Sequence, residues 1–165
     1  IPLINTNEQN ATVCFVKGSH KIFNNIESTN VLPFFHNYKK ELIDQYLKPH
    51  NVQLGKGILF CDSIIHWSPA NLSDQSRPAV QITLIPAQED PIYYYIDKNN
   101  ISSDVEMYKI DSDFFVVNTL DTAINRPTQY EYLGKIKNPN EEVPFESFKD
   151  RLQNHISHRN NFYGL

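Results

Sequence analysis

One segment of this sequence carries most of its information: GILFCDSIIHWSPANLSDQSRPAVQIT, residues 57–83. An apolar run rich in β-branched residues ends at His66, and a second such run begins just after Arg77. The residues between them, Pro69–Gln75, are mostly turn formers, so the chain can reverse there and bring Arg77 near His66. The segment therefore predicts two strands joined by a loop, with a histidine at one end of the loop and an arginine at the other.

The rest of the chain is also patterned mainly as β-structure. Alternating runs of β-branched and aromatic residues, bounded by turn formers, predict strands at Thr12–Lys17, Ile58–Ile65, Val80–Ile85, Ile92–Ile96 and Phe114–Asn118. Helical spacing predicts two short helices, Asn37–Leu47 and Phe145–Ser157, and the poorly patterned stretch Asn118–Pro144 is expected to be loop. No alternation of strands and helices supports a parallel sheet, so we expect a sandwich or a double-sheet jelly roll.

Composition and charge exclude several classes of protein. A chain of 165 residues with 40% apolar residues can fill the core of one ordinary domain. The net charge of −4, without a block of like charges, argues against nucleic acid as a partner. No apolar stretch is long enough to span a membrane and no leader is visible, so we expect a cytoplasmic protein without a membrane partner. Both cysteines, Cys14 and Cys61, lie in apolar runs and are predicted to be buried thiols.

His66 and Arg77 each allow two interpretations. Strand alternation places His66 on the same face as Phe60, as a polar group at the end of an apolar wall. Such an imidazole is either a histidine with a local hydrogen bond or a metal ligand. An arginine at a strand end is either solvated or binds a carboxylate through its planar guanidinium. The residues alone leave these alternatives open.

The spacing within this segment resembles the second half of the phytanoyl-CoA dioxygenase family pattern. In that pattern a strand ends in the distal iron-binding histidine and is followed by a serine, an Asn-x-Ser turn and an arginine. The matching residues here are His66, Ser68, Asn71, Ser73 and Arg77. Residues 1–21 are similar to the strand, Asn-Gly turn and Pro-Gly-Ser-His motif of the family, with Ala11 in place of glycine and Lys17 in place of proline. Nothing after about Ala87 resembles a motif of the family.

The resemblance implies a fold, a cofactor and roles for three residues. The fold would be a mainly β double-stranded β-helix, the jelly-roll or cupin-like architecture, with one or two short helices. The chain would be a non-haem Fe(II)- and 2-oxoglutarate-dependent dioxygenase that uses dioxygen to oxidise a small organic substrate. His66 would be the distal iron ligand, Arg77 would bind the far carboxylate of 2-oxoglutarate, and Ser68 would assist it. His20, in Gly18-Ser19-His20, would belong to a turn.

One element of the family pattern is missing from this sequence. The family holds iron with a His-x-Asp or His-x-Glu pair in addition to the distal histidine, and no such pair follows any of the six histidines. We expect the pair upstream of Ile1, so that residues 1–165 form a single incomplete domain, the C-terminal part of a jelly-roll oxygenase, inactive on its own. Two alternatives stay open: a non-catalytic jelly-roll binding protein, and a halogenase-like variant in which chloride replaces the carboxylate.

Overall fold

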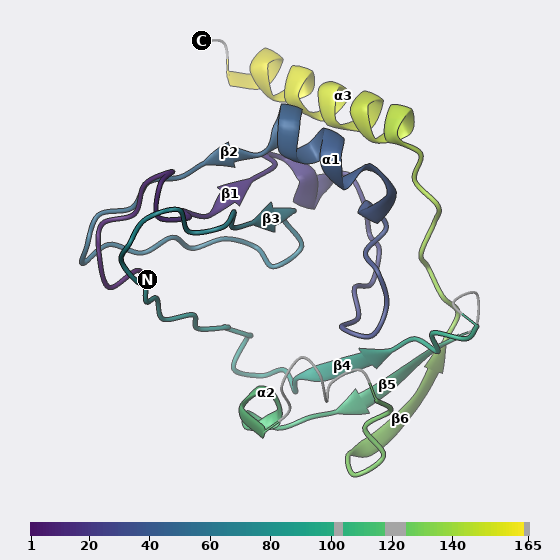
Figure 1. Ribbon diagram of the computed structural model, residues 1–165. Helices are drawn as coiled ribbons and strands as arrows, with labels where there is room; N and C mark the ends of the chain where they lie inside the picture. Colours follow the sequence, from purple (N-terminus) through teal and green to yellow (C-terminus); the bar gives the residue numbers. More distant parts are fainter. Residues whose placement is uncertain (101–103, 118–124, 164–165) are drawn as a thin grey trace. The chain divides into compact units, whose positions relative to one another are not determined.

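The computed structural model of the protein describes residues 1–100, 104–117 and 125–163 (Figure 1). The chain divides into two compact units. Unit 1 comprises Ile1–Phe23, Asn37–Thr83 and Val143–Leu165, and unit 2 comprises Asn24–His36 and Leu84–Glu142. The described residues contain two three-stranded antiparallel sheets and a few helices, and they do not close into a barrel. In this part of the chain no helix combines the length and apolarity needed to cross a membrane.

The sheet of unit 1 has the order β2-β1-β3, with β1 (Cys14–Phe15) between β2 (Lys48–Pro49) and β3 (His66–Trp67). Both pairings are antiparallel, and the central residue Phe15 lies opposite a residue of each neighbouring strand. The predicted strand Thr12–Lys17 is therefore confirmed at its centre. Val16, just past β1, continues the pairing by donating its N–H to the carbonyl of Ile65 at 2.9 Å.

The predicted strands Ile58–Ile65 and Val80–Ile85 are wrong as regular strands. At the second one, pairing is limited to the isolated bridge of Pro2 with Ala79, just before it, and to hydrogen bonds between Ile1 and Val80. Pro2 and Pro78 have no N–H to donate, so the hydrogen-bond ladder cannot extend through them. Along the first one, no ladder forms in the described part of the chain. The alternation of apolar residues was present, but a strand also needs a neighbour to pair with.

The two cysteines differ in their surroundings. Cys14 is buried in the central strand, as predicted, whereas Cys61 is exposed. Its sulfur lies 3.0 Å from Ser63 Oγ, and this hydrogen bond lowers the pKa of the Cys61 thiol. The prediction of a buried Cys61 was wrong because it assumed a covered strand at this position.

Helices cover one side of unit 1. The segment predicted as the helix Asn37–Leu47 is helical as the succession η2 (His36–Tyr38), α1 (Lys39–Glu41) and η3 (Leu42–Tyr46). The second predicted helix is also confirmed, as α3 (Phe145–Tyr163), which lies over α1 in Figure 1. Phe148 is fully buried at this contact, with its ring centroid 5.6 Å from that of Tyr38 and 5.9 Å from that of Tyr46. A short 3-10 turn, η1 (Ser19–Lys21), completes the elements of this unit.

Unit 2 contains the sheet β4-β5-β6, formed by β4 (Ile92–Tyr95), β5 (Val105–Lys109) and β6 (Glu131–Ile136). The predicted strand Ile92–Ile96 is confirmed by β4. The strand β6 lies inside the stretch expected to be loop, so that expectation was wrong. Its residues alternate poorly because β6 is an edge strand with exposed and half-buried side chains along its whole length.

The predicted strand Phe114–Asn118 is helical where it is described. Its first four residues form α2 (Phe114–Val117), and Asn118 lies outside the described residues. The turn before it is shaped by Asp111, whose carboxylate accepts the N–H of Asp113 at 3.1 Å. Asp side chains favour such local hydrogen bonds, which start helices, and Phe114 itself is buried against Tyr93. The apolar run therefore indicated burial correctly and its secondary structure wrongly.

A buried acid in unit 2 is fully paired. Glu106 is 8% exposed and accepts a hydrogen bond from Tyr108 Oη at 2.8 Å. It also forms salt bridges with Arg126 Nε at 2.9 Å and Lys135 Nζ at 3.4 Å. Burial, together with the hydrogen bond to Glu106, raises the pKa of Tyr108 to about 12. Buried charges with such partners are usually structural. Glu106 therefore needs no ligand to account for it.

A strained turn precedes β1. Asn10 is buried, and its side chain donates to Asn5 O at 2.9 Å and accepts from Asn7 N at 2.8 Å. The next residue, Ala11, has a φ of 64° and is 4% exposed. A left-handed conformation at a residue with a Cβ costs about 1–2 kcal/mol, which is why glycine is preferred there. Ala11 thus occupies a position whose geometry suits glycine.

We predict that Ala11→Gly stabilises the protein. Removing the Cβ relieves the left-handed strain, while the greater freedom of glycine in the unfolded chain offsets part of the gain, leaving up to about 1 kcal/mol. Urea unfolding measures the change. Ala79→Gly is the matched control, because φ at Ala79 is not in the left-handed region, and it should lower the stability. Equal losses in both variants would show that the Ala11 turn is not strained.

Candidate active site

His66 lies on an edge strand and is exposed. β3 pairs with β1 on one side only and forms the edge of its sheet. The Nδ1 atom of His66 lies 2.8 Å from the carbonyl oxygen of Ile64. A carbonyl can only accept, so Nδ1 carries the proton in this contact, and in the neutral ring the lone pair is on Nε2. Metal-binding histidines are commonly oriented by a hydrogen bond of this kind from their second nitrogen.

The ring of His66 belongs to an aromatic cluster around Phe15. Phe15 is 5% exposed, and its centroid lies 4.9 Å from that of Phe60, 6.2 Å from His66 and 5.2 Å from His50. The rings of Phe60 and His66 are also in contact, at 5.1 Å. Phe15, Phe60, His66 and His50 are called here the Phe15 cluster. Within it, the rings of Phe15 and Phe60 form an apolar wall against which His66 packs. His50 and Phe15 were not singled out from the sequence, because the cluster depends on the pairing of three separate strands.

The Gly18-Ser19-His20 turn supports the strand that ends in His66. Gly18 has a φ of 88°, and a Cβ at this position would lie 3.3 Å from a ring carbon of His155 in α3. Ser19 is 4% exposed, and its hydroxyl accepts the N–H of Ile65 at 2.8 Å. The serine therefore satisfies a buried backbone donor directly before His66. His20 lies in the turn η1, where the sequence placed it.

The loop after His66 is held by its own polar side chains. Asn71 Oδ1 accepts from the N–H of Ser73 at 3.0 Å and from its hydroxyl at 2.7 Å, and Asn71 Nδ2 donates to Gln75 O at 2.7 Å. The N–H of Leu72 donates to the carbonyl of Gln9 at 2.9 Å, which ties the loop to the turn before β1. This is the Asn-x-Ser turn expected from the sequence. The turn folds the chain back on itself between His66 and Arg77.

Arg77 is half-buried and has an unsatisfied donor. Its Nε is enclosed, and no hydrogen-bond partner for it exists in the described part of the chain. The following residue, Pro78, accepts the N–H of Leu3 at 2.9 Å, which fixes the backbone at this point. An enclosed guanidinium donor without a partner costs stability unless an acceptor is supplied. The site therefore suits an oxygen-rich anion.

The three residues predicted for the site are not in mutual contact. Ser68 is exposed, one residue past β3. Within residues 1–100, 104–117 and 125–163, no hydrogen bond, ion pair or ring contact joins His66 to Ser68 or to Arg77. Their roles therefore stay predictions. What the structure brings together around His66 is the Phe15 cluster.

The donor set for a metal is incomplete in the described residues. His66 is oriented as a nitrogen ligand, but no three histidine, cysteine, aspartate or glutamate side chains come together there as a metal site. A single imidazole does not hold Fe(II), because non-haem iron sites of this class use two histidines and one carboxylate. The described residues therefore offer at most one ligand, His66, to such a site and do not form the site by themselves.

The comparison with known families agrees with this geometry. Residues 1–79 match the family model described as phytanoyl-CoA dioxygenase (PhyH). The resemblance seen in the sequence is therefore confirmed over this part of the chain, which includes the Gly18-Ser19-His20 turn, His66 and Arg77. Members of this family are generally Fe(II)- and 2-oxoglutarate-dependent oxygenases. Searches of the curated proteins and of the solved structures found no match.

We predict that Ser19→Ala destabilises the strand that carries His66. The substitution leaves the buried N–H of Ile65 without its acceptor, which costs about 1–3 kcal/mol. Urea unfolding gives the total change, and hydrogen exchange at the Ile65 amide locates it. Ser63→Ala is the control, since Ser63 is exposed and its loss should change stability by no more than about 0.5 kcal/mol. Unchanged protection of the Ile65 amide in Ser19→Ala would contradict the prediction.

Proposed function

We propose that this chain is the C-terminal part of a jelly-roll oxygenase that depends on Fe(II) and 2-oxoglutarate and oxidises a small organic substrate. The observation that carries the proposal is the orientation of His66. Its Nδ1 is engaged by the Ile64 carbonyl, and its Nε2 is free on an edge strand within the part that matches the PhyH family. Bound Fe(II) would activate dioxygen together with 2-oxoglutarate, which is converted to succinate and carbon dioxide.

In this proposal the residues of the chain bind and orient rather than react. His66 supplies one nitrogen ligand through Nε2. Arg77 pairs with the distal carboxylate of 2-oxoglutarate, which satisfies its enclosed Nε, and Ser68 adds a hydrogen bond to the same cosubstrate. A histidine and a carboxylate outside the described residues complete the iron site, in line with the family pattern. The 165 residues alone are then expected to be inactive.

The aromatic wall beside His66 supports the same proposal. The ring of His66 packs against the apolar rings of Phe15 and Phe60. Apolar walls exclude water from a reacting centre and hold the ligand ring in one orientation. The turn at Ser19 and the loop at Asn71 hold the chain on either side of His66 through short hydrogen bonds. A ligand on such a support loses little entropy when it binds a metal.

We predict that His66→Ala in the full-length protein abolishes tight Fe(II) binding and iron-dependent succinate production. Removing one of three protein ligands leaves a site that holds a labile divalent ion poorly. Titration of the apo-protein with Fe(II) under anaerobic conditions measures the loss. The control is His36→Ala, which removes an exposed histidine of η2 and should leave iron affinity unchanged. Retained iron binding in His66→Ala would show that His66 has only a structural role.

Arg77→Ala is expected to weaken 2-oxoglutarate while leaving iron binding nearly intact. Losing one partner of an enclosed charged pair costs about 2–5 kcal/mol, or roughly 30- to several-thousand-fold in affinity. Arg77→Lys should recover only part of this, because an ammonium group lacks the planar fork. The metal-to-ligand charge-transfer band of the anaerobic complex reports the affinity.

Pyruvate is the matched control ligand for this experiment. It has no distal carboxylate, so it should bind wild type poorly and lose little more in Arg77→Ala. Equal losses for pyruvate and 2-oxoglutarate would mean that Arg77 supports the fold and not the cosubstrate.

A further inference from the structure

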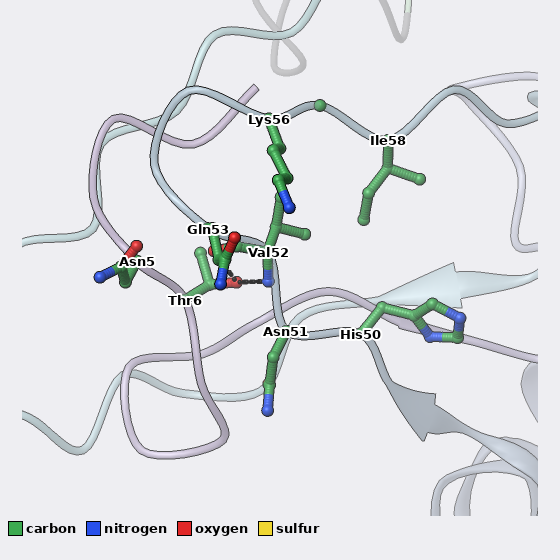
Figure 2. A pocket seen from close by; sticks show the side chains of 9 residues that line it. Asn5, Thr6, His50, Asn51, Val52, Gln53, Lys56 and Ile58 are labelled. Carbon is green, nitrogen blue, oxygen red and sulfur yellow. Dashed lines mark hydrogen bonds between the residues drawn. The ribbon is translucent and has the colours of Figure 1, made fainter.

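Unit 1 contains an open pocket of about 450 Å³ that has no role in the proposal above. It lies beside the chain that leaves β2, and its walls include Asn5, His50, Gln53, Lys56 and Ile58 (Figure 2). Every lining residue belongs to unit 1. The pocket is therefore a property of this unit alone.

The polar side of the pocket favours an anion. Lys56 is its single charged side chain, and none of the nine lining residues is acidic. Lys56 makes no ion pair within the described chain, and Figure 2 shows its ammonium group pointing into the pocket toward Gln53. The carbonyl oxygen of the Asn5 side chain already accepts the N–H of Leu54 at 2.8 Å, so its amide N–H groups are left as donors. The ammonium group of Lys56 is therefore the charged group that can pair with the oxygens of a carboxylate.

The apolar side of the pocket leads toward His66. Leu59 is 88% exposed, whereas Phe60 is 37% exposed and packs against the rings of Phe15 and His66. Lys56 and Ile58 both line the pocket, and Figure 2 shows their side chains extending to the same side of the chain. Phe60 in turn contacts the ring of His66, so an apolar track connects the pocket with the Phe15 cluster.

His50 joins the two ends of this track. Its ring lines the pocket and packs edge-on against Phe15, 5.2 Å between centroids. Its Nδ1 lies 3.3 Å from the Lys48 carbonyl oxygen. Lys56 is the one lysine or arginine among the lining residues.

We propose that this pocket binds the carboxylate of an apolar organic acid, with Lys56 pairing the carboxylate and the apolar body lying along Ile58 and Phe60 toward His66. The inference rests on the proposed function in one respect: if His66 holds iron, the acid is the substrate and is oxidised at a carbon remote from its carboxylate. Binding of the acid itself requires no metal.

The test is calorimetric titration of the metal-free whole chain with 4-phenylbutyrate, whose aromatic ring suits the Phe15 cluster. Lys56→Met keeps the aliphatic stem, removes the charge and should weaken binding about three- to thirtyfold. Lys48→Met removes an exposed charge from β2, outside the pocket lining, and should leave the affinity unchanged. The neutral analogue 4-phenylbutyramide should bind wild type more weakly than the acid does. Its affinity should be the same for Lys56→Met and for Lys48→Met. Melting temperatures confirm that each variant is folded.

Several outcomes would overturn the inference. These are no binding of 4-phenylbutyrate, equal affinities for acid and amide in wild type, or equal losses in Lys56→Met and Lys48→Met. A loss in Lys56→Met that affects 2-oxoglutarate instead of 4-phenylbutyrate would assign the pocket to the cosubstrate, which also overturns it. Failure of the oxygenase proposal is seen separately, as absent iron binding, because the titration contains no iron.

Discussion

The antiparallel pairing of β1 with β3 is the constraint on which the candidate site depends. Phe15 and His66 lie opposite each other in this pairing, and Val16 extends it to Ile65. In a sheet, residues directly opposite have neighbouring side chains on one face. The pairing therefore places the imidazole of His66 against the buried ring of Phe15. A shift by one residue would turn His66 to the other face and dissolve the Phe15 cluster.

Short polar side chains hold the irregular segments around this pairing. Ser19 satisfies the N–H of Ile65, Asn71 closes the loop that leads to Arg77, and Asn10 closes the turn before β1. Serine and asparagine are suited to this because their side chains reach nearby backbone groups without ordering a long side chain. The site is thus supported by local hydrogen bonds at three turns, and a small sheet suffices to carry it.

The two proposals rest on two cationic side chains, and these differ in their surroundings. Arg77 is half-buried with an enclosed donor, which suits a carboxylate that is held tightly and in one orientation. Lys56 is exposed at an open pocket, where a hydrated ammonium group recognises charge with less geometric demand. If both proposals hold, Arg77 binds 2-oxoglutarate, the cosubstrate shared by the family. The open pocket at Lys56 then binds the organic acid that serves as substrate. The Phe15 cluster would then lie along the path between the substrate carboxylate and the metal.

The sequence by itself determined the family resemblance, the two helical regions at Asn37–Leu47 and Phe145–Ser157, and the local turns. The spacing from His66 to Arg77, the glycine at position 18 and the asparagine at position 71 act within a few residues, where local hydrogen bonds and φ preferences decide the conformation. Ala11 is a further local feature of this kind. It stands where the family pattern has glycine, and its φ is 64°.

Only the tertiary structure decided which apolar runs become strands and which side chains meet. Ile58–Ile65 and Phe114–Asn118 both alternate like strands, yet in the described chain the first is paired only at its last residue and the described part of the second is helical. The contact of His50 with Phe15 and the pocket at Lys56 likewise join residues far apart in the chain. The physical reason is that periodicity reports which side chains favour burial, whereas a strand or a pocket also requires a partner surface, and pairing between distant segments leaves no local signal.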